Sequence, residues 1–208
     1  MHKSLLTLFL LFSLFVNAAT YDFHDTQFFY KRISEADKTV ELVAGDAPYT
    51  GDIVLPEHIN TGGQIYRVVR VGVGAFRDCS EVTSIHISSS ITHIGEYAFS
   101  GTAITRLSIP ANVTRIDDRI CAQCDSLKEL IIEDDTTTLA FKASDNFMFY
   151  GCPISKVYIG RNLTYKYRAS YPNPRAESPF ESVGSTLTDV ELGDNVTVIY
   201  HRMFSKFE

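Results

Sequence analysis

The chain repeats one pattern of apolar residues about every 23 positions, and this repeat limits its folds more than any other feature. Three segments align closely: VRVGVGAFRDCSEVTSIHI (69–87), THIGEYAFSGTAITRLSI (92–109) and TRIDDRICAQCDSLKELII (114–132). Their aliphatic anchors Val71, Ile94 and Ile116 lie 23 and 22 residues apart. A unit of this size cannot bury an apolar face alone, so we expect the units to stack around one continuous core.

Further copies follow after longer connections, in FMFYGCPISKVYI (147–159) and SPFESVGSTLTDVEL (178–192). VTVIYHRMF (196–204) opens another copy, with Val196, Ile199 and Phe204 in register. The sequence stops before this copy reaches its strand. We therefore expect an array truncated in its last repeat, either a fragment of a longer adhesin or a chain that associates end to end through an uncapped C-terminus.

The end of each unit, such as TSIHI or TRLSI, alternates apolar and polar residues and is expected to form a short strand. Stacking would place these strands side by side in a parallel sheet on a concave face. Phe76 and Phe99 would fill the return side, which is expected to consist of turns or single helical turns. Gly72 and Gly95 indicate tight backbone positions where the coil turns back. The fold class is thus an α/β-type leucine-rich-repeat solenoid, rich in β-structure.

The segments before the repeats divide in two. Residues 1–18 have a basic start, an apolar run from Leu5 to Val16 and small residues at Ala18 and Ala19. This is the pattern of a signal peptide cleaved after Ala18, and the apolar run is too short to span a membrane. Residues 19–68 contain alternating apolar runs separated by Gly, Pro and Asn, and are expected to form a cap of β-hairpins. Residues 69–208 would be the solenoid.

The repeats YRVVRVGVGAF, ITHIGEYAFSGTAITRLSIPANVTRI and VELGDNVTVIYHRMF resemble the leucine-rich repeats of BspA-type surface proteins of Bacteroidetes-like bacteria. The resemblance covers nearly all of the chain after the signal peptide. Departures occur at Asp117, Ile120–Cys121, Tyr200 and Met203. The resemblance implies an exported protein with a role in adhesion or host contact, and it brings no shared catalytic site and no cofactor.

Composition excludes several other classes of function. The net charge of −6 comes without any basic tract, so neither nucleic acid nor an anionic membrane is an expected partner. The sequence contains no GxSxG, HExxH or P-loop pattern, and its histidines fall on different rungs, so we expect no enzyme. The alternative is a carbohydrate-active hydrolase or a glycan-binding protein on a solenoid scaffold. Paired carboxylates across the concave face would favour the hydrolase.

The four cysteines fall into repeat positions. Cys121 occupies the position of the core Phe, and Cys79, Cys124 and Cys152 share one column. We expect free, buried thiols and no metal, because a second pair of ligands is missing from the neighbouring sequence. Cys124 with Cys152 is the better candidate if a disulfide forms, although side chains in one column point in parallel.

Residues beside the buried strand positions should point outward on the concave sheet. One column contains Ser84, Arg106, Glu129, Lys156 and Asp189, and the next contains His86, Ser108, Ile131, Tyr158 and Glu191. The alternating charges of the first column suit a ladder that maintains register. An exposed aliphatic residue beside an exposed tyrosine is more typical of a contact surface. The candidate ligand-binding residues are therefore Ile131 and Tyr158, with His86, Arg106, Glu129 and Lys156 around them. The expected partner is an extracellular protein or glycan.

Overall fold

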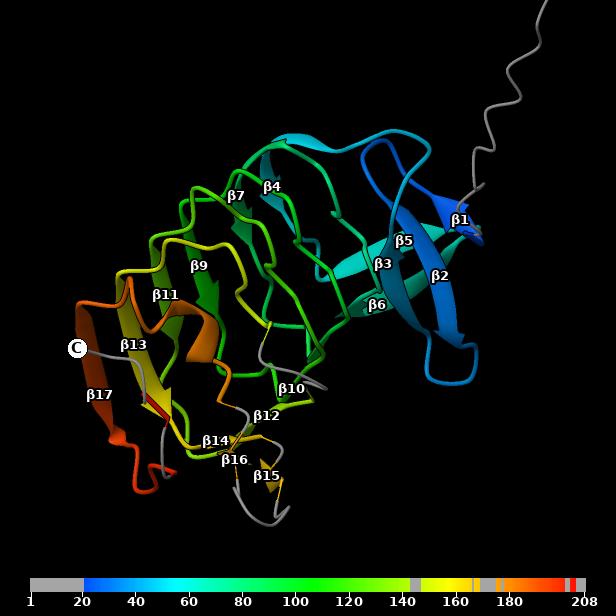
Figure 1. Ribbon diagram of the computed structural model, residues 1–208. Coiled ribbons are helices and arrows are strands. Elements are labelled where there is room, and N and C mark those ends of the chain that lie inside the picture. The colour runs from blue at the N-terminus through cyan, green and yellow to red at the C-terminus, as the bar shows by residue number, and fades with distance from the viewer. Residues whose placement is uncertain are drawn as a thin grey trace, which may run out of the picture.

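The computed structural model describes residues 21–142, 147–165, 167–168, 175–176, 178–200 and 203–204. The predicted signal peptide lies outside these residues. The described part is built almost entirely of strands and turns, with one short 3₁₀ helix at Glu181–Val183 within it. Successive coils follow one another from the N-terminal strands to β17 (Asp189–Asn195) (Figure 1). No helix in these residues is long and apolar enough to cross a membrane.

The alternating segments of the second to fifth copies of the repeat form one parallel sheet. Its four strands are β9 (Arg106–Ile109), β11 (Glu129–Ile132), β13 (Lys156–Arg161) and β17, in the order β17-β13-β11-β9. Leu107 pairs with Leu130, and Leu130 with Val157, so equivalent repeat positions are neighbours. These side chains are buried, which confirms the predicted strands and their register.

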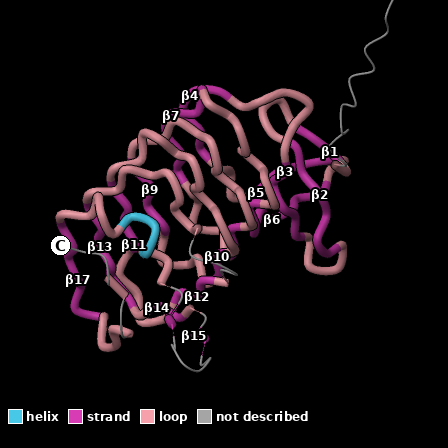
Figure 2. The backbone as a smooth tube through the Cα atoms, viewed as in Figure 1, coloured by secondary structure: helices cyan, strands magenta, loops and turns pink. Residues whose placement is uncertain are grey.

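A second set of parallel strands forms another side of each coil. The C-terminal end of β6 (Gln64–Val71) pairs with β8 (His93–Ile94), and β10 (Arg115–Ile116), β12 (Leu139–Phe141) and β14 (Leu163–Thr164) follow in order. Most of these strands have only two or three residues. Figure 2 shows that loops and turns make up most of each coil between the two sheets.

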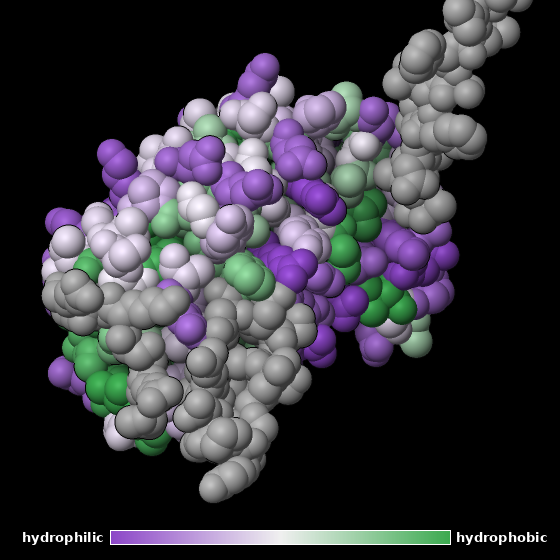
Figure 3. Space-filling model, viewed as in Figure 1, coloured by the Kyte–Doolittle hydropathy of each residue, from purple (hydrophilic) through white to green (hydrophobic). Residues whose placement is uncertain are grey.

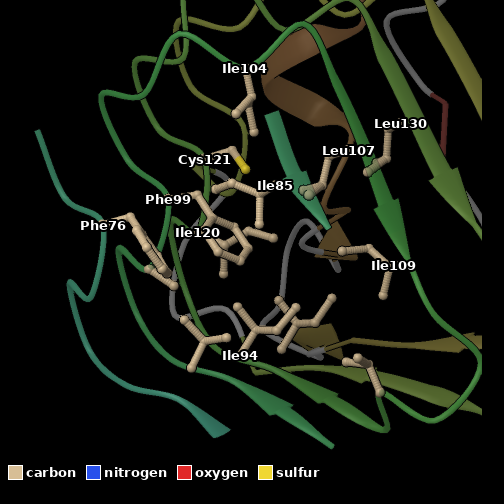
Figure 4. Close-up of a cluster of buried hydrophobic side chains, with 14 of the residues drawn as sticks. Phe76, Ile85, Ile94, Phe99, Ile104, Leu107, Ile109, Ile120, Cys121 and Leu130 are labelled. Carbon is tan, nitrogen blue, oxygen red and sulfur yellow. The ribbon is translucent and has the colours of Figure 1, made fainter. Parts of the chain in front are cut away.

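Turns on the return side also connect one coil to the next. The backbone N–H of Phe76 donates to the carbonyl of Ala98, and that of Phe99 to Ile120, both at 2.8 Å. The rings of Phe76 and Phe99 lie 6.0 Å apart, and those of Phe149 and Phe180 lie 6.2 Å apart and stack. Cys121 continues the column after Phe99, across the core from Leu107 and Leu130 (Figure 4). The core is thus continuous from coil to coil.

The residues before the repeats form a mixed unit. β1 (Phe23–His24), β2 (Phe29–Ser34) and β3 (Thr39–Val43) are antiparallel neighbours, and β5 (His58–Thr61) is antiparallel to β6. However, β3 is parallel to β6, and β4 (Thr50–Val54) is parallel to β7 (Glu81–His86). The first parallel coil therefore begins before residue 69, and the boundary predicted there falls inside β6.

The two repeat glycines are required for a different reason than the one predicted. Neither has a positive φ, so neither is needed for the turn itself. A Cβ on Gly95 would lie 2.9 Å from the backbone of Gly72, and a Cβ on Gly72 would lie 2.8 Å from the carbonyl oxygen of Leu42. These glycines permit neighbouring coils to approach closely.

A two-stranded ribbon, β15 (Tyr167–Arg168) with β16 (Arg175–Ala176), projects from the fourth coil. It belongs to the longer connection between the fourth and fifth copies of the repeat. The core and the four-stranded sheet continue past it.

Candidate functional site

The outward face of the four-stranded sheet, hereafter the strand face, carries the charged column predicted from the sequence. Arg106, Glu129, Lys156 and Asp189 are consecutive neighbours in the parallel register. Arg106 Nε lies 3.4 Å from Glu129 Oε2, with the two side chains 60% and 39% exposed. Exposed ion pairs contribute at most about 1 kcal/mol, so this column serves register and solubility more than stability.

The adjacent column holds the predicted apolar pair. Ile131 pairs with Tyr158 on one side and with Ser108 on the other, and Tyr158 pairs with Glu191. Ile131 and Tyr158 are both half-buried. The structure therefore brings together a partly exposed aliphatic side chain and a partly exposed ring on neighbouring strands.

Tyr158 is fixed by groups that the sequence pattern did not indicate. Its hydroxyl donates a 2.8 Å hydrogen bond to Asp134 Oδ2. This bond, followed by desolvation and the nearby carboxylates of Asp134, Glu191 and Asp194, raises the pKa of the tyrosine above its ordinary value. The phenol thus remains protonated and acts as a donor at neutral pH.

Glycines next to Asp134 make this contact possible. A Cβ on Gly193 would lie 2.6 Å from the Tyr158 hydroxyl oxygen and 2.5 Å from Asp134 Oδ1. A Cβ on Gly160 would lie 2.5 Å from the backbone nitrogen of Asp134. Side chains at either position would displace Asp134. The signal in the sequence was a glycine directly after the alternating apolar residues of two consecutive repeats, Gly160 in β13 and Gly193 in β17.

Carboxylates gather around one end of the apolar pair. Glu133, Asp134, Glu191 and Asp194 are exposed, and Glu133 Oε1 accepts a 2.9 Å hydrogen bond from Ser108. Among the described residues, no group of His, Cys, Asp or Glu side chains is arranged to hold a metal ion. We call Ile131, Tyr158 and these four carboxylates the Tyr158 patch.

The structure separates His86 from the Tyr158 patch. His86 lies at the end of β7, which pairs with β4 in a separate two-stranded sheet, and its partner there is Val54. Ser84, from the same strand, donates a 2.7 Å hydrogen bond to Asp52 Oδ1. The predicted columns are therefore continuous only from β9 to β17. β7 lies between β4 and β9 in the stack, and within the described residues it forms a strand pair with β4 but none with β9, so His86 is outside the sheet that holds the other candidate residues.

The cysteines are free and buried, as predicted. Cys124 Sγ lies 3.1 Å from the carbonyl oxygen of Phe99, and Cys152 Sγ lies 2.8 Å from that of Cys121. Burial raises the pKa of the Cys121 thiol well above its ordinary value, and hydrogen bonding to Cys124 together with burial raises that of Cys152. A protonated thiol inside an apolar core is a poor nucleophile, so Cys121 and Cys152 act as packing residues. Hydrogen bonds with Cys121, Cys152 and Thr102 lower the pKa of the Cys124 thiol, although its burial acts in the opposite direction.

Comparison with known proteins identifies the repeat. A family model described as the BspA type leucine rich repeat region, in six copies, matches residues 64–174, which is just over half of the chain. No protein with a curated description matches the chain significantly.

Solved structures share the fold. A leucine-rich repeat protein from Bacteroides capillosus ATCC 29799 is 20% identical with a TM-score of 0.52, over 82% of this chain and 96% of that one. The T. pallidum leucine rich repeat protein is 18% identical with a TM-score of 0.52, over 84% and 83%. The pneumococcal vaccine antigen PcpA is 12% identical with a TM-score of 0.55, over 86% of this chain and 51% of that one. At these sequence identities the similarity to solved structures shows the fold alone, whereas the family model matches the sequence of the repeat itself. The chain belongs to the BspA-type leucine-rich-repeat family.

Proposed function

We propose that the chain is an exported, non-enzymatic binding module, a capped solenoid that contacts an extracellular protein through the concave strand face. Export is inferred from the signal-peptide pattern of residues 1–18. The antiparallel strands at the N-terminal end cover the first coil and act as its cap. Adhesion at the bacterial surface is the role that suits such a module.

The observation that carries this proposal is the fixed ring of Tyr158 beside Ile131. A side chain already held in place loses little conformational freedom on binding, so its contacts contribute more to affinity. Tyrosine offers a large apolar face together with a polar group, and such residues dominate the energetics of protein interfaces. The charged column beside it would form the polar rim.

A glycan is the second candidate ligand. The carboxylates around Tyr158 can accept hydrogen bonds from sugar hydroxyls, and the aromatic ring can contact the face of a sugar. Hydrolysis of a glycan is a weaker proposal, because it requires two cooperating carboxyl groups about 5–10 Å apart. On this face Glu129 is flanked by Arg106 and Lys156. In the Tyr158 patch, Asp134 already accepts a hydrogen bond from Tyr158, and Glu133 accepts one from Ser108.

Binding of the mature chain to arrays of extracellular-matrix proteins and of glycans tests the proposal. Tyr158→Ala should weaken binding at least tenfold, while Lys142→Ala, at an exposed position outside the strand face, should leave it unchanged. Tyr158→Phe retains the ring and removes the bond to Asp134, so its effect should be intermediate. Unchanged affinity of Tyr158→Ala for every array ligand would remove the strand face from consideration.

A further inference from the structure

The strand face ends at β17 with a backbone edge that is open to a further strand. Among the described residues β17 pairs with β13 alone, and it is the longest strand of the four-stranded sheet. The N–H of Asp189 donates to the carbonyl of Ser155 in the preceding coil. Because these groups alternate in direction along a parallel strand, the N–H and C=O groups of Val190 and Leu192 point to the opposite side. β17 therefore offers backbone donors and acceptors to a partner.

The apolar side chains of β17 are less covered than their equivalents in the preceding coils. Leu130 and Val157 are buried. Val190, which pairs with Val157, is only partly buried against the core, and Leu192 is 40% exposed. A further strand would complete the core here if it carried aliphatic residues opposite Val190 and Leu192. Because alternate residues of a strand point to opposite faces, these aliphatic residues would occupy every second position.

The charges of the strand face indicate which residues would occupy the other positions. The charged column alternates in sign and consists of Arg106, Glu129, Lys156 and Asp189. Opposite charges directly across neighbouring strands are favourable, so the next place beyond Asp189 suits a cation. Glu191 lies two residues further along β17 and faces the same way. Both side chains are exposed, and within the described residues neither carboxylate has a hydrogen-bond or ion-pair partner.

A second copy of the chain fits this edge poorly. Its own β17, DVELGDN, would bring carboxylates against the same carboxylates. At the opposite end of this side of the stack lies β4, whose Asp52 pairs with Ser84, the residue equivalent to Arg106 in the preceding repeat (Figure 1). A head-to-tail contact in the repeat register would therefore place Asp52 opposite Asp189. Like charges directly opposite each other are destabilising, and charged side chains on an edge strand hinder pairing between identical chains.

We propose that the free edge of β17 binds an extended polypeptide segment in which basic and aliphatic residues alternate. The segment adds to the sheet as a further parallel strand, and its backbone bonds to Val190 and Leu192. Its basic side chains face Asp189 and Glu191, and its aliphatic side chains cover the exposed end of the core. The backbone edge supplies the binding, and the two carboxylates select basic residues. This site shares Glu191 with the Tyr158 patch, but it goes beyond the function proposed for that patch and does not depend on it.

A labelled peptide of alternating lysine and valine, with the length of β17 and blocked termini, is a suitable probe. Fluorescence anisotropy should show saturable binding to the mature chain, and the affinity should fall as salt screens the charges. In the repeat register the outward-facing residues donate their N–H groups to the preceding strand, as Asp189 does. Methylation of the lysine backbone nitrogens should therefore abolish binding. Methylation of the valine backbone nitrogens, which face away from β17, should leave binding unchanged.

Variants of the protein test the selection of basic residues. Asp189→Asn and Glu191→Gln should each weaken peptide binding about threefold, and the double variant about tenfold, because exposed ion pairs across strands are modest. The matched control Glu81→Gln changes an exposed carboxylate of β7 and should bind as the wild type does.

Several outcomes would overturn the proposal. Equal binding of the two methylated peptides, or of a peptide with its lysines and valines in separate blocks, would show that charge alone attracts the peptide. Variants of Asp189 and Glu191 that behave like the control would show that these carboxylates select nothing. Absence of saturable binding would remove the site. A dimer of the chain that excludes the peptide would assign the edge to a second copy.

Discussion

Some residues differ from the repeat pattern at positions where another coil provides a partner for their side chains. Asp117 stands where two earlier coils have Gly72 and Gly95, and its carboxylate lies 2.7 Å from His93 Nε2 and 2.8 Å from Arg115. A charged residue thus enters a column of close backbone contact because it faces a histidine and an arginine. Arg161 behaves similarly, since its buried guanidinium donates to the carbonyl oxygens of Pro110 and Ala111 two coils away. Both residues thus provide a hydrogen-bond or ion-pair partner for polar groups of another coil.

His93 should make the protein less stable in mild acid. Its pKa lies below the ordinary value, chiefly because of burial and also because of Arg70 and Arg115, although Asp117 acts in the opposite direction. The unfolded chain then binds a proton more readily than the folded one. The stability contributed by neutral His93 is present above about pH 6.5 and is lost as pH falls toward the folded pKa.

Urea unfolding followed by tyrosine fluorescence at about pH 8 and about pH 5.5 measures this effect. The wild type should lose more unfolding free energy over this interval than His93→Gln, which retains a polar side chain without the titration. A His93→Gln variant with the same pH dependence as the wild type would show that other groups dominate.

At the scale of elements, the alternation of apolar and polar residues along a strand determined which strand contacts could be predicted from the sequence. Arg106, Glu129, Lys156 and Asp189 fell into one column because their segments share a period of two and end each repeat. The second sheet could not be found this way, since β8, β10 and β14 are only two residues long. The contact of Tyr158 with Asp134 depends on residues after the strand, where the alternation has ended. Pairing of β4 with β7 joins distant segments whose sequences carry no mark of each other.

The strand register predicts a sharp contrast between consecutive residues of β9. Leu107 is fully buried between its neighbours, whereas the hydroxyl of Ser108 makes an exposed bond to Glu133. Leu107→Ala should cost about 2–5 kcal/mol of unfolding free energy, because it leaves a cavity in a continuous core. Ser108→Ala should cost less than about 0.5 kcal/mol. Denaturant unfolding of both variants checks the register, which equal losses would contradict.

At the scale of the whole molecule, each coil contacts mainly its neighbours, so stability is built from successive interfaces. The central coils have a neighbour on both sides. Figure 3 shows that hydrophobic residues are visible at the surface in places along the described part, among them at the side where β17 lies.

Export should remove the N-terminal segment that precedes these coils. The apolar run ends in Val-Asn-Ala at residues 16–18, and small residues at such positions are those that signal peptidase accepts. The exported protein should begin at Ala19, and intact-mass measurement of material secreted from a bacterial host would establish this. Recovery of a protein that retains residues 1–18 would contradict the export proposal.

The rate of amide hydrogen exchange should increase along the stack of coils and be highest in β17. Within the described residues β17 has a strand partner on one side, β13, whereas β11 pairs with both β9 and β13. Apolar side chains also become more exposed toward β17. Leu130 and Val157 are buried, whereas Leu192, Val198 and Ile199 are 40%, 45% and 53% exposed. Amides with fewer ladder bonds and less covering apolar surface open at a lower free energy.

Residues 189–200 should therefore exchange faster than 129–132 in dilute solution. If exposed apolar residues at this end drive end-to-end association, the difference should shrink as concentration rises, together with an increase in light scattering. Equal protection of both segments in a dilute monomer would contradict the prediction, because it would require that the outer face of β17 be covered as completely as that of β11.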